Sequence, residues 1–351
     1  MTTCTGYGAT SATSELTPMH FERRELREND VAISIDYCGI CHSDAHQAHN
    51  DWGNTTYPCV PGHEIVGRVT AVGSAVTRYA IGETVAVGCL VDSCMACEAC
   101  EDGHEQFCNH GATATYNGKD RHTGEITYGG YSDHVVVREH FVLKVPAPLK
   151  TEWAAPLLCA GITCWTPLRQ WKVGKGSKVA VVGLGGLGHM GVKLAVALGA
   201  QVTMITTSSG KGKDALAMGA SHVLLSTDAE AMKAAINSYD FILDTIPVKH
   251  AVSPYLMLLR REGALVIVGA IEPIESVHGG LLVRNNRSLA GSAIGGIAAT
   301  QELLNFCAEH QIHPDCEVVR MQDVNTAWKR MQANDVKYRF VIDMASLREA
   351  A

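Results

Sequence analysis

A glycine-rich turn follows a short apolar run directly in the sequence Lys178-Val179-Ala180-Val181-Val182-Gly183-Leu184-Gly185-Gly186-Leu187-Gly188. The run at 178–182 has the composition of a buried strand, and residues 187–198 have the spacing of an apolar helix that ends before Gly199. A GxGxxG motif between a strand and a helix is typical of a dinucleotide-binding loop, whereas the motif alone is a weak signal. The sequence therefore predicts a loop that binds the pyrophosphate of a dinucleotide.

The glycines of this loop have separate roles. Gly183 permits the tight turn, Gly185 lets the backbone approach the phosphates, and Gly188 allows the helix to pack closely on the strand. The unpaired N–H groups and partial positive charge at the start of the helix favour an anion. A glycine-rich turn without a ligand is the weaker interpretation of this placement. Cofactor contacts are expected from Gly183, Leu184, Gly185, Gly186, Leu187 and Gly188.

Strands and helices alternate from residue 151 to about residue 285. One of the helices is expected to end at Gly219. Such alternation is typical of an α/β fold with a doubly wound parallel sheet, so 151–285 is predicted to be a Rossmann-type nucleotide-binding domain. Further strands are predicted at 202–206, 222–225, 241–244 and 265–268.

Residues 1–150 have a different composition. They are rich in Gly, Cys and His and contain short β-branched runs, such as 31–35 and 134–137, which predict a loop-rich, mainly-β domain. The mixed pattern of residues 286–351 indicates that the end of the chain returns to this domain. A chain of 351 residues with 46% hydrophobic residues is long enough to form both cores.

Composition excludes several classes of partner. A net charge of −7 without a basic run argues against nucleic acid, and the apolar stretches are too short to span a membrane. The chain has 13 cysteines, an odd number, and residues 1–20 lack the apolar core of a secretory signal. We therefore expect a cytoplasmic protein with reduced thiols.

The residues after the second strand of this domain favour one dinucleotide. An enzyme that uses NAD usually has a carboxylate there for the ribose 2′-hydroxyl group. In this chain no carboxylate appears before Asp214, and hydroxyl groups with lysines can instead bind the 2′-phosphate of NADP. Lysines that merely solvate a helix start are the alternative. The sequence predicts NADP(H), bound by residues of the segment Thr206-Thr207-Ser208-Ser209-Gly210-Lys211-Gly212-Lys213, mainly Thr206, Thr207, Ser208 and Lys211.

A closely spaced cysteine quartet predicts a structural metal site. Its spacing is C-x2-C-x2-C-x7-C, and four thiolates can surround one Zn²⁺ without leaving a ligand position open. An iron–sulfur run of the ferredoxin type would end in C-x3-C-P, which does not fit the long last gap or Asn109 after it. The quartet consists of Cys94, Cys97, Cys100 and Cys108.

A second set of metal-type residues consists of Cys41, His63 and Cys159. Two thiolates and one imidazole leave a fourth position for water or a substrate oxygen, which is the arrangement of catalytic zinc. Zinc at such a site polarises a carbonyl group. Each residue alone is more often structural, but together with the quartet and the dinucleotide loop they predict a zinc-dependent dehydrogenase.

The chain resembles the zinc-dependent medium-chain alcohol dehydrogenases over almost its full length. The segment Gly62-His63-Glu64-x-x-Gly67-x5-Gly73-x-x-Val76 is similar to the zinc signature of this family. The segments 158–163 and 52–58 resemble the cinnamyl-alcohol-dehydrogenase branch, especially its bacterial broad-range aldehyde reductases. The resemblance implies a GroES-like catalytic domain formed by both chain ends around a Rossmann domain, two Zn²⁺ per chain and a homodimer. It also implies reversible reduction of aldehydes to primary alcohols with NADPH.

The resemblance also implies roles for single residues. Cys41, His63 and Cys159 would bind the catalytic zinc, with Glu64 as a transient ligand and Asp44 on the other nitrogen of His63. Ser43 would hydrogen-bond the substrate oxygen and pass its proton through the cofactor ribose to His46; a surface imidazole is the alternative for His46. The family pattern places further residues near the cofactor: Thr163, Thr245, Gly269, Ser292, Ala293 and Ile294.

The substrate is the least determined part of this interpretation. Trp52, Cys89 and Tyr116 are expected in the pocket wall, although the two aromatic rings could equally belong to the core. An apolar pocket separates related substrates by only about 1–3 kcal/mol per methylene group, so a broad range of aldehydes is expected. Two alternatives remain: an NAD-linked dehydrogenase of polyols or secondary alcohols, and a non-catalytic zinc- and nucleotide-binding redox sensor.

Overall fold

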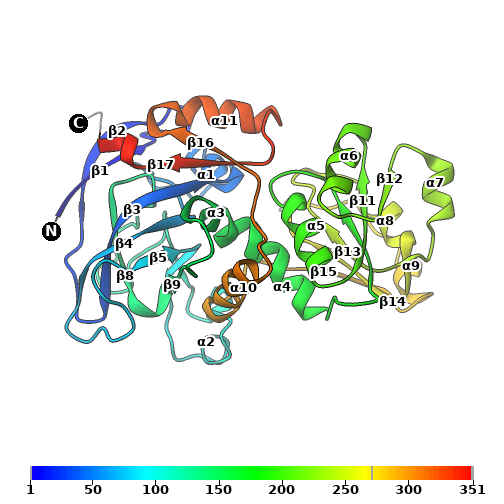
Figure 1. Ribbon diagram of the computed structural model, residues 1–351, viewed down its shortest axis with the longest axis horizontal. Helices are drawn as coiled ribbons and strands as arrows, with labels where there is room; N and C mark the ends of the chain where they lie inside the picture. The colour runs from blue at the N-terminus through cyan, green and yellow to red at the C-terminus, as the bar shows by residue number, and fades with distance from the viewer. Residues whose placement is uncertain (1, 270–271, 349–351) are drawn as a thin grey trace. The chain divides into compact units, whose positions relative to one another are not determined.

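The chain folds into two units, and each unit has its own central sheet (Figure 1). The computed structural model describes residues 2–269 and 272–348. Unit 1 comprises Met1–Cys159 and Gly295–Ala351, and unit 2 comprises Ala160–Ile294. The first boundary lies later than residue 150 because helix α3 (Thr151–Pro156) packs on strands β3 (Asp30–Ile40) and β4 (Ile65–Val72) of unit 1. The second boundary lies later than residue 285 because strand β15 (Ser288–Gly291) still belongs to the sheet of unit 2.

Unit 2 contains a six-stranded parallel sheet with the strand order β12-β11-β10-β13-β14-β15. Numbered within the unit, this order is 3-2-1-4-5-6, which confirms the predicted doubly wound Rossmann fold. The predicted segment 265–268 is only the end of a longer strand, β14. The strands are β10 (Lys178–Val182), β11 (Gln201–Thr206), β12 (His222–Leu225), β13 (Tyr239–Asp244), β14 (Leu259–Ile267) and β15.

Helices connect these strands, and the apolar side of a helix such as α8 (Ser253–Leu258) packs on the sheet. The core beneath α8 contains side chains such as Val182, Ile205, Ile242 and Leu265, all with at most 1% of their surface exposed. The helices of the unit are α4 (Ile162–Gln170), α5 (Gly188–Ala197), α6 (Ser209–Ala217), α7 (Ala229–Ala234), α8 (Ser253–Leu258) and α9 (Gly280–Val283).

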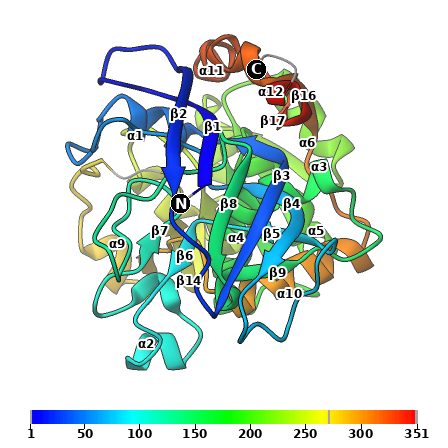
Figure 2. The ribbon, with the colours of Figure 1, turned by 90° about the vertical axis from the view of Figure 1, so that its left-hand side faces the viewer.

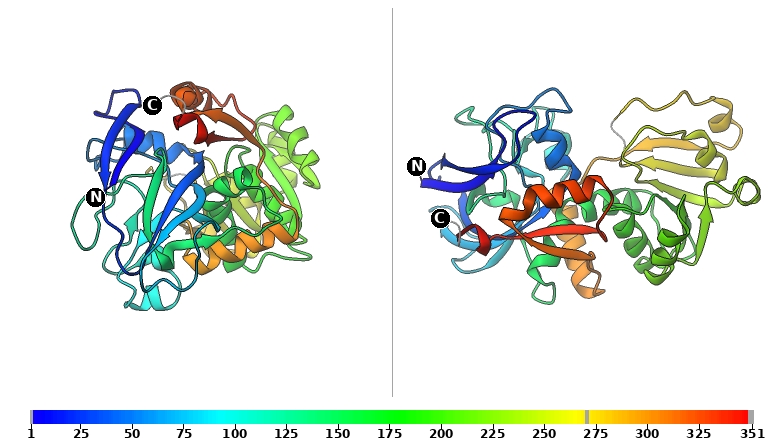
Figure 3. Two further views of the ribbon diagram at one scale, coloured as in Figure 1. Left: turned by 60° about the vertical axis from the view of Figure 1, so that its left-hand side comes forward. Right: turned by 90° about the horizontal axis from the view of Figure 1, so that it is seen from above.

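Unit 1 is built around a seven-stranded sheet with the order β16-β17-β3-β4-β5-β9, in which β8 also pairs with β3 (Figure 2). Strand β17 runs antiparallel to β3, so both ends of the chain contribute to one sheet, as expected for the GroES-like domain. The C-terminal strands β16 and β17 lie beside helix α11 (Val324–Gln332), all in orange to red, in both views of Figure 3. The sheet strands are β3 (Asp30–Ile40), β4 (Ile65–Val72), β5 (Thr84–Val87), β8 (His134–Arg138), β9 (Val142–Lys144), β16 (Cys316–Arg320) and β17 (Arg339–Asp343).

Shorter elements complete unit 1. Two antiparallel ribbons pair β1 (Thr2–Gly8) with β2 (Thr17–Arg23), and β6 (Leu90–Asp92) with β7 (Thr113–Ala114). Single 3₁₀ turns lie at Glu105–Phe107, Glu139–Phe141 and Met321–Asp323, and a π-helical turn at Leu157–Gly161 continues from α3 into unit 2. The remaining helices are α1 (His42–Ala48), α2 (Glu98–Glu101), α10 (Ile297–Glu309), α11 (Val324–Gln332) and α12 (Ala345–Arg348).

Candidate metal centres and cofactor loop

The pairing of β3 with β4 brings the first two residues of the open metal set together. Cys41 follows the last residue of β3, and His63 lies two residues before β4. The strands are antiparallel, with Cys38 opposite Ile65, so both ligands lie at the same end of the pair. Cys159 comes from the π-helical turn that follows α3, and such turns are frequent at functional sites.

The geometry of this set fits zinc. The ligand atoms of Cys41, His63, Glu64 and Cys159 all lie within 4.8 Å of one another, and all four residues are buried. The two sulfur atoms are 3.8 Å apart. Tetrahedral zinc with Zn–S bonds of about 2.3 Å would hold two sulfurs about 3.8 Å apart. Hydrogen bonding between the thiols lowers the pKa of Cys41 and raises that of Cys159.

Asp44 holds this set in place through both of its oxygen atoms. Its Oδ1 accepts hydrogen bonds from the N–H of Gly62 at 3.0 Å and lies 3.2 Å from His63 Nδ1. Its Oδ2 accepts from the N–H of Cys41 at 2.8 Å and from the hydroxyl group of Tyr131 at 3.1 Å. The contact to Cys41 caps the first turn of α1. A completely buried carboxylate thus fixes His63 with its Nε2 available for a metal ion.

Glu64 forms a buried ion pair with Arg339 of β17. Burial raises the pKa of Glu64 to about 8, and the guanidinium group of Arg339 opposes this increase. Within the described residues, the buried Oε2 atom of Glu64 has no hydrogen-bond partner, so it is available as a ligand to a metal ion. A Cβ atom at Gly39 would overlap this oxygen. Arg339 was not predicted, because a charge at the end of the apolar run 340–342 looks like an ordinary solvated residue in the sequence.

The three predicted pocket residues lie in unit 1, and two of them border the open metal set. The hydroxyl group of Tyr116 is 3.1 Å from His63 Nδ1, and its ring packs on the imidazole. The thiol of Cys89 lies 3.6 Å from the carbonyl of Leu158, and hydrogen bonding with Cys159 lowers its pKa to about 6. Trp52 is 39% exposed, and its ring centroid is 5.9 Å from that of His46.

The two relay residues lie on α1, directly after Cys41. Ser43 and His46 are three positions apart and therefore lie on the same side of the helix. The side chain of His46 is 42% exposed, and its Nδ1 is 2.7 Å from Asp51 Oδ2. Asp51 was not singled out from the sequence because nothing in a single carboxylate after a helix distinguishes it from a solvated loop residue.

The cysteine quartet also fits one metal ion. Its four sulfur atoms lie within 4.8 Å of one another. Cys100 Sγ is 3.5 Å from Cys97 Sγ and 3.9 Å from Cys94 Sγ. Backbone N–H groups point at two of the sulfurs, from Cys94 to Cys108 and from Asn109 to Cys97. Such N–H groups stabilise thiolates, and the bonds from Asn109 and Cys100 lower the pKa of Cys97 to about 6.

Among the described residues, one further group of metal-type side chains lies close together: Cys4, Asp133 and His134. Asp133 Oδ1 is 2.8 Å from Cys4 Sγ and 2.6 Å from His134 Nδ1. The hydrogen bond to Asp133 raises the pKa of His134 to about 9. The buried guanidinium group of Arg23 lies against the same residues and donates to the carbonyl of His134. The guanidinium group of Arg23 already provides a positive charge beside this cluster, so we interpret the cluster as a structural ion-pair network.

The predicted cofactor loop has the geometry that its glycines require. Gly183 has φ = +87°, a left-handed conformation that favours glycine. A Cβ atom on Gly188 would overlap the carbonyl oxygen of Gly183. Apart from its own chain neighbours, no described heavy atom lies within 4 Å of a Cβ position on Gly185, so the backbone is open to a ligand there. The loop thus leaves space where a pyrophosphate is expected, at the start of α5.

The turn between β11 and α6 carries the residues predicted for the 2′-phosphate. Thr206 ends β11 and accepts a hydrogen bond from the N–H of Ser208 at 3.2 Å. Ser208 caps α6, where its hydroxyl oxygen accepts from the N–H of Lys211 at 3.4 Å. Thr207 is exposed and Lys211 is partly exposed. Hydroxyl groups, helix N–H groups and a lysine side chain therefore lie in one turn, with no carboxylate among them.

The other predicted cofactor residues are distributed over unit 2. Thr245 follows β13 directly, and its hydroxyl group lies 2.8 Å from the carbonyl of Val182 and 3.0 Å from that of Gly183. Gly269 approaches the backbone of Thr245 so closely that a Cβ would contact it at 2.6 Å. Thr163 is buried in α4, and Ser292 donates its N–H to the carbonyl of Ile267. Ala293 and Ile294 end the unit, and Ile294 has φ = +35°.

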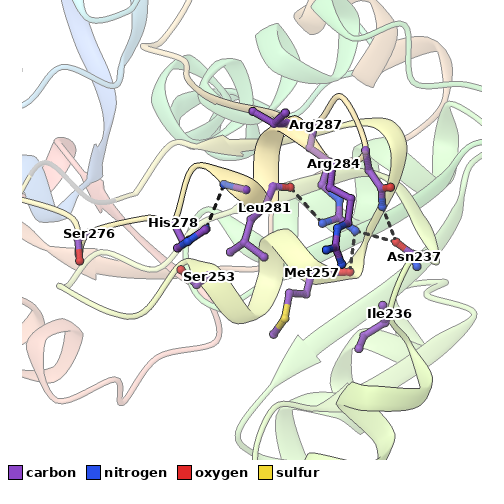
Figure 4. Close-up of a pocket in the computed structure, with 12 residues that line it drawn as sticks. Ile236, Asn237, Ser253, Met257, Ser276, His278, Leu281, Arg284 and Arg287 are labelled. Atoms are coloured by element: carbon purple, nitrogen blue, oxygen red, sulfur yellow. Dashed lines mark hydrogen bonds between the residues drawn. The ribbon is translucent and has the colours of Figure 1, made fainter.

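A cavity of about 780 Å³ lies elsewhere in unit 2, between α8 and α9 (Figure 4). Its lining includes Met257, His278 and Arg284 but none of the predicted cofactor residues. Arg287 crosses it and donates to the carbonyls of Leu259, at 2.8 Å, and Met257, at 3.2 Å. These contacts tie β14 and α8 to the segment before β15, which is a structural role.

Two family models match most of the chain. Residues 27–147 match the alcohol dehydrogenase GroES-like domain, and residues 186–309 match the zinc-binding dehydrogenase family. The chain is 52% identical over 344 residues to aldehyde reductase YahK of Escherichia coli strain K12, covering 97% of this chain and 98% of the relative. It is 50% identical over 349 residues to NADP-dependent alcohol dehydrogenase C 1 of Mycolicibacterium smegmatis, covering 99% and 100%.

A solved structure extends this similarity to the whole fold. The cinnamyl alcohol dehydrogenase SbCAD4 from Sorghum bicolor matches with a TM-score of 0.95 and 46% identity, and the match covers 98% of both chains. The chain therefore belongs to the zinc-dependent medium-chain alcohol dehydrogenases, in the branch that resembles the cinnamyl alcohol dehydrogenases.

Proposed function

We propose that this chain reduces aliphatic and aromatic aldehydes to primary alcohols with NADPH, and catalyses the reverse reaction. The observation that carries the proposal is the open set of Cys41, His63 and Cys159, with Asp44 fixing the imidazole. The curated names of similar proteins, an aldehyde reductase and an NADP-dependent alcohol dehydrogenase, support it. The turn after β11, which has hydroxyl groups and Lys211 in place of a carboxylate, supports NADP(H).

The site supports a division of roles in the reaction. When bound, zinc supplies a Lewis acid that polarises the carbonyl group, and NADPH supplies the hydride. Cys41, His63 and Cys159 would hold the metal ion, and Glu64 would be available as a transient ligand. Ser43 donates a proton to the substrate oxygen, and His46, partly exposed and held by Asp51, exchanges protons with solvent. Trp52, Cys89 and Tyr116 belong to the wall of the substrate pocket in this proposal: Cys89 and Tyr116 border the open metal set, and Trp52 lies beside His46.

Three further features belong to this proposal. Each chain binds two zinc ions, one at the open set and one at the quartet. None of the thirteen cysteines forms a disulfide bond in the described residues, which suits the reducing cytoplasm. The chain forms a homodimer, for which β15 at the edge of its sheet and Val283, 82% exposed, offer a surface. Light scattering would give twice the mass of the chain for a dimer.

No helix in the described residues has the length and apolar character needed to cross a membrane.

The first test is the absorbance of the nicotinamide during incubation with cinnamaldehyde, using NADPH or NADH, before and after a zinc chelator. We expect fast NADPH oxidation that the chelator abolishes. Preference for NADH together with oxidation of polyols would favour the polyol dehydrogenase alternative. Binding of zinc and NADPH without turnover on any aldehyde would favour the redox sensor.

Replacing Ser43 by Ala is expected to lower kcat by roughly a hundredfold, since positioned proton transfer contributes about 10²–10⁴-fold. The affinity for NADPH should change little. The companion variant His46→Ala should also lose turnover, and imidazole in the buffer should restore part of it. A Ser43→Ala enzyme with normal turnover would rule out the relay.

Replacing Thr206 by Asp is expected to lower the preference for NADPH over NADH by at least about tenfold. A carboxylate there would repel the 2′-phosphate, and like-charge contacts cost several kcal/mol. The ratio of kcat/KM with the two cofactors measures the preference. The control is Thr227→Asp, which adds the same charge at an exposed position after the next strand, β12. An unchanged ratio in Thr206→Asp would show that the 2′-phosphate binds elsewhere.

A further inference from the structure

A buried carboxylate ends the strand next to the cofactor loop. Asp244 is the last residue of β13, and its side chain is completely buried. Its Oδ1 accepts a hydrogen bond from the N–H of Ile246 at 3.2 Å, and its Oδ2 lies 2.7 Å from His250 Nε2. Both contacts are to the turn that follows the strand. A carboxylate buried at this depth is stable only when such partners compensate its lost hydration.

His250 has both ring nitrogens occupied. Its Nδ1 lies 2.8 Å from the carbonyl oxygen of Val248, which can only accept, so Nδ1 carries a hydrogen. Its Nε2 faces the carboxyl group of Asp244, so one proton lies between these two atoms, on either residue. Burial raises the pKa of Asp244, which favours retention of this proton. The ring of Tyr255 from α8 packs nearby, with centroids 6.1 Å apart, and the exposed Lys249 is the charged neighbour in the turn.

The turn 245–250 borders the glycine loop. Thr245 bonds the carbonyl groups of Val182 and Gly183, and a Cβ on Gly183 would lie 3.4 Å from the side chain of Ile246. Strands β10 and β13 are neighbours at the centre of the sheet, where the strand order reverses. Ligands of doubly wound sheets bind outside the carboxyl ends of the strands at this point. The turn therefore forms one side of the place where the dinucleotide binds.

We propose that the Asp244–His250 pair is a positioning device for the cofactor, which holds the turn 245–250 against the glycine loop as a preformed wall of the NADPH site. Neither residue need touch a reacting atom. Without the pair the turn would be mobile, and NADPH would have to order it on binding, at a cost in affinity. The proposal rests on the proposed function only for the identity of the cofactor.

The first experiment measures KM and kcat for NADPH, and the dissociation constant from nicotinamide fluorescence, in His250→Ala. We expect KM and the dissociation constant to rise on the order of tenfold, the effect of leaving one buried polar group without its hydrogen-bond partner, while kcat stays within about twofold. The matched control is His222→Ala. It removes an exposed imidazole at the first residue of β12, where the strands of the sheet begin, away from the cofactor loop. It should leave all three values unchanged.

The substitution Asp244→Asn removes the charge of the carboxyl group but keeps both of its hydrogen bonds. The amide group can donate to Nε2 of a neutral His250, while its oxygen still accepts from Ile246. We therefore expect near-normal affinity for NADPH in Asp244→Asn, and a loss in His250→Ala. If His250→Ala does not fold, His250→Gln keeps an N–H donor for Asp244 but not the imidazole, and an intermediate loss of affinity is expected.

Trypsin gives a readout that does not depend on catalysis. Lys249 is exposed, so trypsin cuts the peptide bond that follows Lys249 when the turn becomes mobile. We expect fast cleavage there in His250→Ala, slow cleavage in the native chain and in Asp244→Asn, and protection of the variant by NADPH. Unchanged affinity together with unchanged cleavage in His250→Ala would overturn the proposal, as would a loss of kcat at constant KM.

These outcomes are distinguishable from failure of the proposed function. A chain that reduces no aldehyde can still bind NADPH, and the fluorescence and cleavage measurements remain informative. If NADH binds and NADPH does not, the same variants are compared with NADH, and the expected changes are the same.

Discussion

Replacing Cys159 by Ser is expected to leave the purified chain with one zinc ion in place of two, and to lower turnover by more than about a hundredfold. Loss of a residue that merely orients a metal ligand costs about 10–100-fold in metal affinity or activity, and loss of a ligand costs more. A serine hydroxyl stays protonated at neutral pH and binds zinc poorly compared with a thiolate. Zinc content by atomic emission, together with NADPH oxidation, measures both effects.

The remaining zinc ion in this variant should belong to the quartet, because its four sulfurs come from the segment 94–108 alone. Binding of NADPH should persist, because the glycine loop contains no metal ligand. Cys316→Ser is the matched control: it removes a partly exposed thiol in β16 that belongs to neither set, and it should retain both ions. Two full zinc sites in Cys159→Ser would contradict the assignment of this ligand.

Replacing Arg339 by Met is expected to destabilise the protein by about 3–5 kcal/mol, since it leaves the carboxylate of Glu64 buried without its partner. Arg339 is 5% exposed and Glu64 is fully buried, so water cannot replace the guanidinium group. The midpoint of urea unfolding, measured on the zinc-loaded protein at a pH above 8, where the carboxyl group of Glu64 is ionised, reports the change.

A second substitution tests the cause of this loss. In the double variant Glu64→Gln/Arg339→Met, no unpaired charge remains, and most of the lost stability should return. The control is Arg330→Met, which breaks the exposed pair with Glu317 in the same unit and should change the midpoint far less. Equal losses in Arg339→Met and in the double variant would show that packing, and not the buried charge, is responsible.

The sequence was most informative where a local pattern contains its own structural context. The glycine loop lies between an apolar run and a helix, so its conformation and its place in the doubly wound sheet could both be predicted. The cysteine quartet was equally predictable, because all four residues lie within one short segment. In both cases the relevant neighbours in space are also neighbours in the chain.

Long-range partners could not be predicted in this way. Arg339 meets Glu64 only because β17 pairs with β3, and no local pattern encodes that pairing. Tyr116 was assigned to the pocket wall from its aromatic ring, whereas its hydroxyl group lies against His63. His250 was passed over because a single histidine next to a lysine after a strand resembles many solvated residues. Its role became visible only with the buried Asp244 beside it.

The unit boundaries have a consequence for how such enzymes can be diversified. Every residue of both metal sets lies in unit 1, and Cys159 is its last residue before the chain enters unit 2. Every residue of the glycine loop and of the turn after β11 lies in unit 2. Exchanging residues 160–294 between two relatives would therefore transfer the glycine loop and the turn after β11 together. The metal chemistry of the recipient would remain intact, ligand for ligand.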